Sequence, residues 1–93
     1  MFVIVKSGPD TQDGKRGIKL ARDMSADICL IQNAVYFAQQ EGLEGFCGTV
    51  YALEDDLRLR GLKDEELGRG VKKLGYENLV ELMAEKDKVI GMF

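Results

Sequence analysis

The sequence has no histidine and no tryptophan, one proline, and two cysteines in 93 residues. Histidine is the common general base, a frequent metal ligand and the side chain that titrates near neutral pH. Its absence excludes Ser-His-Asp and Cys-His catalysis, histidine metal sites and histidine pH switches. Cys29 and Cys47 form neither a CxxC pair nor a pair of metal-ligand pairs. A cytoplasmic protein with reduced thiols is the simplest interpretation.

Long apolar segments and an excess of basic residues are also missing. The longest apolar runs, Met1–Val5 and Ala34–Ala38, are far shorter than the roughly 20 residues that cross a bilayer, so we expect no membrane span. No basic region precedes a long apolar stretch, so no signal peptide is predicted. Sixteen acids against 13 bases give a net charge of −3. This balance disfavours direct binding to nucleic acid, which needs Lys and Arg to neutralise phosphates.

What is present fits one globular domain over residues 1–93. Apolar residues make up 45% of the chain and charged residues 31%, which is typical of a folded protein. A domain of this size has a thin core, so self-association is an open possibility.

Apolar clusters alternate with helical patterns along the chain. The clusters expected to form strands are Phe2–Val5, Ile28–Ile31, Thr49–Leu53, Val71–Leu74 and Val89–Phe93. Helices are expected over Lys15–Met24, after Asn33 as N-cap, over Glu54–Arg60 and over Tyr76–Met83, with at most one helical turn in Asp64–Gly70. The order predicts an α/β fold: a single three-layer domain with a mostly parallel sheet of about five strands and helices on both faces.

Ligands of such sheets bind beyond the carboxyl ends of the strands. The residues expected there are Ser7 and Gly8 after the first strand and Gln32 and Asn33 after the second. They are the candidate ligand-binding residues if the chain is a small-ligand-binding module.

Two local patterns have simpler explanations than catalysis. Gly8 and Gly14, followed by Lys15, have the wrong spacing for a phosphate-binding loop and lack the Ser or Thr after the lysine, so a mobile loop is expected. The acids of Glu54–Asp56 suit the start of a helix, and adjacent helical residues diverge too far to converge on one ion. Glu54 with Arg58 and Asp56 with Arg60 are expected to form i,i+4 ion pairs. No metal site or cofactor is therefore predicted.

The two cysteines differ in their expected surroundings. Cys29 lies inside an apolar strand, where a thiol is inert core packing. Cys47 lies between Phe46 and Gly48, just before the third strand, where it is the candidate for a persulfide-carrying thiol. Of Tyr36 and Phe37, which cannot share one helix face, one is expected at the surface or at a subunit contact.

Three stretches together resemble a known family. They are Leu30–Ala38 (LIQNAVYFA), Val50–Gly61 (VYALEDDLRLRG) and the terminal block Tyr76–Phe93. They resemble the DsrH/TusB family of sulfur-relay subunits, and the likeness extends over nearly the whole chain.

The resemblance implies the small DsrE-type α/β fold. It also implies a cytoplasmic complex with DsrE/TusD-like and DsrF/TusC-like partners, or a homo-oligomer in their place. TusB-type proteins serve 2-thiouridine formation at the tRNA wobble position, and DsrH-type proteins serve dissimilatory sulfur metabolism.

The resemblance transfers no catalytic residue. In the DsrE/TusD-like partner the sulfur-carrying cysteine ends the third strand, which corresponds to about Leu53 here. The cysteine that some DsrH proteins carry in the first helix corresponds to a position near Ile18. The resemblance thus implies a non-catalytic docking or structural subunit, with a persulfide carrier through Cys47 as the alternative.

Overall fold

The computed structural model describes residues 1–39, 43, 46, 48–68, 70–86, 88–91 and 93. Five strands form one sheet in the order β4-β3-β2-β1-β5, and all neighbouring strands are parallel. The strands are β1 (Phe2–Val5), β2 (Asp27–Leu30), β3 (Val50–Leu53), β4 (Val71–Leu74) and β5 (Val89–Ile90). The other elements are α1 (Gln12–Asp23), η1 (Gln32–Ala38), α2 (Glu54–Leu59), η2 (Asp64–Glu66) and α3 (Tyr76–Glu85). The predicted α/β architecture is confirmed.

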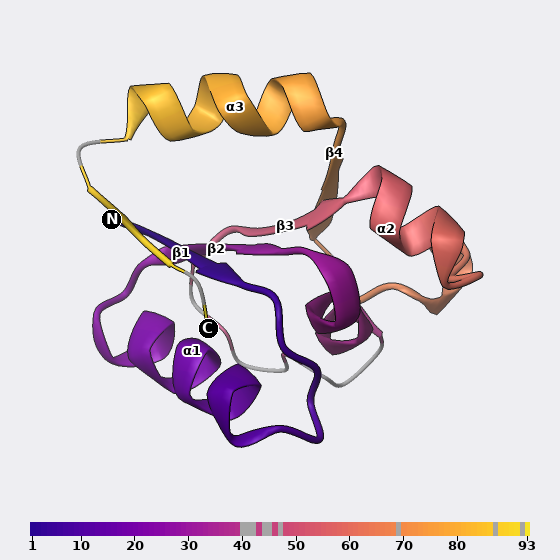
Figure 1. Ribbon diagram of the computed structural model, residues 1–93, viewed down its shortest axis with the longest axis horizontal. Coiled ribbons are helices and arrows are strands. Elements are labelled where there is room, and N and C mark those ends of the chain that lie inside the picture. The colour runs from indigo at the N-terminus through magenta and orange to yellow at the C-terminus, as the bar shows by residue number, and fades with distance from the viewer. Residues whose placement is uncertain (40–42, 44–45, 47, 69, 87, 92) are drawn as a thin grey trace.

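Helices cover both faces of the sheet, which makes three layers (Figure 1). On one face, Val3, Val5, Ile28 and Leu30 pack with apolar side chains of α1, η1 and α2. On the other face, Phe2, Ile4 and Cys29 pack with Leu79 of α3. The central strands β1 and β2 alternate their side chains between two dry layers, which explains their uninterrupted apolar runs.

The helix α1 begins earlier than the sequence indicates. Thr11 is its N-cap, and the Thr11 Oγ1 accepts a hydrogen bond from the Gly14 N–H at 3.0 Å. Gly14 is buried in the first turn, where a Cβ would overlap the main-chain oxygens of Ser7 and Gly8. The expectation of a mobile loop through Gly14 is therefore wrong, because this glycine lets the helix start close against the end of β1.

The segment after β2 also departs from expectation. It is a 3₁₀ helix whose N-cap is Ile31, rather than a helix capped by Asn33. Gln32 has a φ of 50°, and the Ala34 N–H bonds to the carbonyl oxygens of Ile31 and Lys6 at 3.0 and 3.2 Å. The Asn33 side chain is thus free to bond elsewhere.

The last strand is shorter than predicted. β5 pairs with β1 only at Val89 and Ile90. Phe93 still lies along β1, because its N–H donates to the Ile4 carbonyl oxygen at 3.2 Å and its own carbonyl oxygen accepts from the Ser7 N–H at 2.9 Å. The ladder therefore gives way to irregular pairing after two residues.

The helix α3 offers a matched pair of substitutions that tests how this layer is held. Leu79 is 6% exposed and is the buried residue of the helix, whereas its neighbour Val80 is 53% exposed. Leu79→Ala should lower the free energy of unfolding by about 2 to 5 kcal/mol, because it leaves a cavity in the core. Val80→Ala should change it by less than about 0.5 kcal/mol. Equal losses in urea unfolding would show that α3 is packed differently.

Candidate functional site at the carboxyl edge of the sheet

The parallel sheet brings the ends of β1 and β2 to one edge, as predicted. The Lys6 carbonyl oxygen accepts a hydrogen bond from Ala34 at 3.2 Å. A Cβ on Gly8 would lie 3.5 Å from the Asn33 Cβ and 3.0 Å from the Asp10 Oδ1. The two loops therefore touch at this edge.

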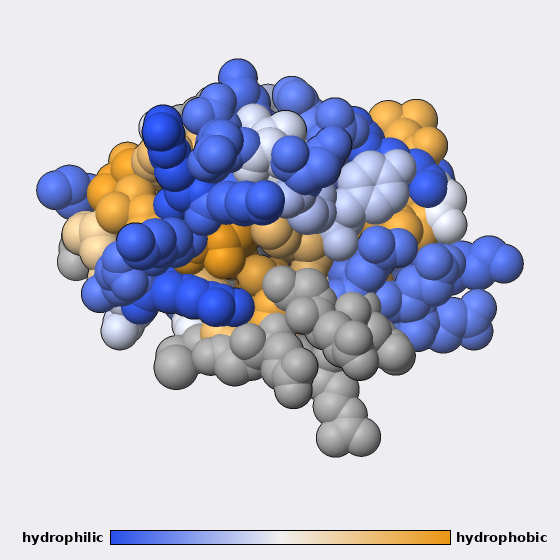
Figure 2. All heavy atoms as spheres, turned by 90° about the horizontal axis from the view of Figure 1, so that it is seen from below, coloured by the Kyte–Doolittle hydropathy of each residue, from blue (hydrophilic) through white to orange (hydrophobic). Residues whose placement is uncertain are grey.

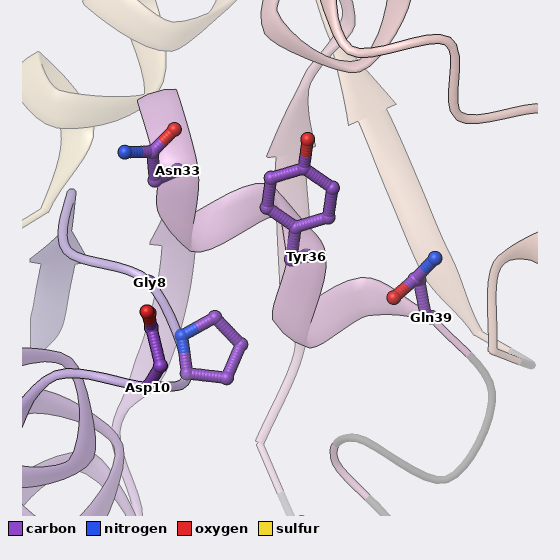
Figure 3. Close-up of a pocket in the computed structure, with 6 residues that line it drawn as sticks. Gly8, Asp10, Asn33, Tyr36 and Gln39 are labelled. Carbon is purple, nitrogen blue, oxygen red and sulfur yellow. The ribbon is translucent and has the colours of Figure 1, made fainter.

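An open hollow of about 460 Å³ lies between these loops (Figure 3). Its lining residues are Gly8, Pro9, Asp10, Asn33, Tyr36 and Gln39. Of the four predicted ligand residues, Gly8 and Asn33 line the hollow and Ser7 and Gln32 do not. The Ser7 N–H is bonded to the Phe93 carbonyl oxygen. Ligand binding by any of the four stays a prediction.

Four lining residues were not identified from the sequence, namely Pro9, Asp10, Tyr36 and Gln39. Side chains three positions apart share one face of a 3₁₀ helix, because this helix has three residues per turn. Asn33, Tyr36 and Gln39 have that spacing, and all three line the hollow from η1 and its end (Figure 3). The i,i+3 spacing was the available signal, and the expectation of an α-helix concealed it. Tyr36 is 37% exposed and Phe37 is buried, which confirms that one of the two lies at the surface.

Two of the three sequence stretches that resemble the family, Leu30–Ala38 and Val50–Gly61, meet at this edge through Asp56 and Arg60. The Asp56 Oδ2 accepts a hydrogen bond from the Gln32 N–H at 2.7 Å. The Arg60 Nε donates to the Asn33 Oδ1 at 3.1 Å. Asp56 and Arg60 also pair with each other at 3.5 Å, and only 15% and 20% of their side chains are exposed. We call these four residues the edge clamp.

The edge clamp explains why a glutamine can hold a left-handed conformation. A non-glycine residue at a φ of 50° is uncommon and persists only where the surroundings fix it. Here the Asp56 carboxylate satisfies the Gln32 N–H with a charge-assisted hydrogen bond. The Asn33 Oδ1 accepts a hydrogen bond from Arg60, so the side-chain amide nitrogen of Asn33 remains as a hydrogen-bond donor.

The acidic side chains of α2 therefore take part in different interactions. Glu54 pairs with Arg58 at 3.5 Å on the surface, and Asp56 belongs to the edge clamp. Both expected i,i+4 pairs are confirmed. Over the part of the chain that the structure describes, no group of three His, Cys, Asp or Glu side chains could hold a metal ion.

Asp56 and its neighbour Asp55 provide a test of the edge clamp. Asp56→Ala removes the acceptor of the Gln32 N–H and the carboxylate that pairs with Arg60, so it should lower the free energy of unfolding by about 1 to 3 kcal/mol. Asp55→Ala removes only an exposed contact with Arg58 at 3.9 Å and should cost less than about 0.5 kcal/mol. If urea unfolding gives the same loss in the free energy of unfolding for both variants, the edge clamp does not stabilise the fold.

The thiol of Cys29 is unreactive because it is buried in the core. Cys29 on β2 is fully buried, and burial, with a smaller contribution from the Asp56 carboxylate, raises the pKa of its thiol to about 12. Leu53 and Ile18, where the resemblance led us to expect the cysteine positions of related proteins, are both 7% exposed and packed in the core. Cys47 lies outside the described residues.

Thiol reactivity tests this placement of Cys29. In a Cys47→Ser variant at pH 8, the remaining thiol should be neutral, because its pKa of about 12 lies far above that pH. We expect no reaction with a disulfide reagent in the folded protein and one equivalent after unfolding in urea. Burial raises the pKa of this thiol from its ordinary value of 9.0 to about 12, so the thiol leaves the free energy of unfolding unaffected below pH 9 and lowers it as the pH rises from 9 toward 12, where only the unfolded chain ionises. Fast labelling of the folded variant would contradict the burial of Cys29.

No helix among the described residues is long and apolar enough to span a bilayer.

Comparisons with known proteins agree with this fold and with the stretches that form the edge clamp. The family described as "DsrH like protein" matches residues 7–89. The crystal structure of the YchN protein from E. coli superposes with a TM-score of 0.83 at 18% identity, over 98% of this chain and 97% of that chain. The solution NMR structure of protein Tm0979 from Thermotoga maritima superposes with a TM-score of 0.65 at 32% identity, over 98% of this chain and all (100%) of that chain. No curated protein matches the sequence significantly.

The similarity to YchN shows a shared fold. The family match is evidence from the sequence that the chain belongs to this family. The match includes all four residues of the edge clamp, since Gln32, Asn33, Asp56 and Arg60 fall within residues 7–89. The chain belongs to the DsrH-like family and is a sulfur-relay protein of the DsrH/TusB type.

Proposed function

We propose that this chain is a non-catalytic docking subunit of a cytoplasmic sulfur-relay complex. In this proposal a DsrE/TusD-like chain carries the persulfide and a DsrF/TusC-like chain completes the assembly. The sulfur would be destined for 2-thiouridine at the tRNA wobble position. The net charge of −3 supports a role in which another subunit contacts the tRNA.

One observation carries the proposal. Leu53 ends β3, at the position where the DsrE/TusD-like relatives place the sulfur-carrying cysteine, and it is 7% exposed. A carrier thiol must be accessible and readily deprotonated. An apolar side chain cannot form a persulfide, and Cys29 has neither the exposure nor the low pKa that such a carrier needs.

Persulfide loading tests the absence of catalytic sulfur chemistry. The purified protein is incubated with a cysteine desulfurase and cysteine and then treated with a persulfide-specific label. We expect no labelling of the wild type or of Cys29→Ser, with a DsrE-like protein as the positive control. Label on the wild type that disappears in Cys47→Ser would instead establish the alternative, a persulfide carrier through Cys47.

Affinity capture tests the docking role itself. Tagged protein should retain DsrE/TusD-like or DsrF/TusC-like chains from the same cells, or associate with itself. A strict monomer that retains neither partner would contradict the proposal.

A further inference from the structure

The outer surface of α3 combines exposed apolar side chains with acids that have no ion pair among the described residues. Tyr76 and Val80 are 65% and 53% exposed, and Ala84 continues the same stripe one turn further on. Glu77, Glu81 and Glu85 form a second stripe beside it, all exposed. None of the three acids has an ion pair with the described residues. We call these six residues the α3 face.

The charges of the α3 face are unfavourable for the helix that carries them. Glu77 repels Glu81, and Glu81 repels Glu85, because residues four apart are neighbours on a helix. Glu85 is the last residue of α3, where the helix dipole favours a cation. No described residue offsets these unfavourable charges with an ion pair. Unfavourable local interactions of this kind are expected at functional surfaces. A basic surface placed on the α3 face would relieve all of these repulsions.

The same chain carries a basic surface on the opposite side of the sheet. α1 covers the face away from α3 (Figure 1), and its Lys15, Arg16 and Lys19 are exposed. These three have no ion pair with any residue that the structure describes. Half-buried Leu20 and Met24, which is 43% exposed, add apolar area beside them. Seen from below, the molecule presents mainly hydrophilic side chains over this helix (Figure 2). We call these five residues the α1 face.

The spacing of the charges on the two faces matches. Lys15 and Lys19 are four residues apart, as are Glu77 and Glu81, so each pair spans about 6 Å along its helix. Both faces also place apolar side chains next to the charges. The glutamates of one copy can therefore pair with the lysines of another, while the apolar side chains beside them become buried between the two copies.

We propose that the α3 face of one copy docks on the α1 face of a second copy, head to tail. Docking of α3 on α3 is disfavoured, because it would place three carboxylates of one copy against three of the other. Because the two faces lie on opposite sides of the sheet, every docked copy keeps one face free, so further copies can add head to tail. The acidic α3 face also disfavours anionic lipid or nucleic acid as its occupant. The inference rests on the proposed docking role and assigns it a surface.

Charge reversal followed by mixing tests the proposal. We expect the mass of the wild type in sedimentation velocity to rise with concentration. Glu77→Lys with Glu81→Lys should weaken self-association at least about tenfold, because both faces are then basic. Lys15→Glu with Lys19→Glu should do the same, because both faces are then acidic. An equimolar mixture of the two variants should associate again, since every α3 face then finds a complementary α1 face.

The controls separate this result from misfolding and from a general charge effect. Asp55→Lys with Glu65→Lys changes the net charge equally on exposed positions away from both faces, and it should leave the association unchanged. Circular dichroism checks the fold of each variant. For the wild type alone, raising the ionic strength from about 0.05 M to about 0.5 M should weaken association, because the Debye length shortens.

Three outcomes would overturn the inference. They are a wild type that is monomeric at every concentration, reversed variants that associate like the wild type, and a mixture that does not restore association. If the monomer still captures a relay partner, only the self-docking inference fails, and the proposed function stands.

Discussion

The structure depends on the burial of β1 and β2 on both faces. Six of the seven largest fully buried side chains belong to these two strands, namely Phe2, Val3, Val5, Ile28, Cys29 and Leu30, and the seventh is Val35. Each large apolar side chain contributes about 1.5 to 3 kcal/mol when it leaves water. A sheet that is apolar on both faces needs a layer of helices on each side. α1 and η1 form one layer and α3 forms the other, so the three-layer fold follows from the two central strands.

Parallel strands gather their carboxyl ends at one edge, and this chain stabilises that edge with a charged network. The 3₁₀ helix η1 starts with Gln32 in a left-handed conformation, and Asp56 and Arg60 of the α2 region hold this start through hydrogen bonds. The network joins the end of β2 to the helix after β3. The resemblance places the sulfur-carrying cysteine of the DsrE/TusD-like relatives at about Leu53, directly before that helix. This edge of the sheet therefore consists of structural contacts around an open hollow. The aliphatic side chain of Leu53 cannot carry a persulfide.

Much of the fold could be predicted from local patterns, because β1, β2 and β3 are short apolar runs and α1 and α3 have periodic apolar positions. Val71–Leu74 was predicted with the correct bounds even though this edge strand is half exposed. Contacts between distant residues could not be predicted in this way. Asp56 and Arg60 were recognised as a pair within one helix, but their bonds to Gln32 and Asn33 cross 24 and 27 residues of sequence. The 3₁₀ form of η1 was missed for the same reason, since the bond from Asp56 helps to hold its start. As a result, Gly8 and Asn33 were identified at the hollow, whereas Pro9, Asp10, Tyr36 and Gln39 were not.

The central claim is that this protein supplies contact surface to a sulfur relay while another chain holds the reactive sulfur. The uncompensated acids of α3 and the buried thiol of Cys29 both fit that division. Native mass spectrometry of the endogenous assembly, purified without reducing agent from cells in which sulfur transfer is active, tests the claim most directly. The account predicts that the mass of one additional sulfur atom is found on a companion chain and never on this one. An additional sulfur atom carried by this chain itself would contradict it.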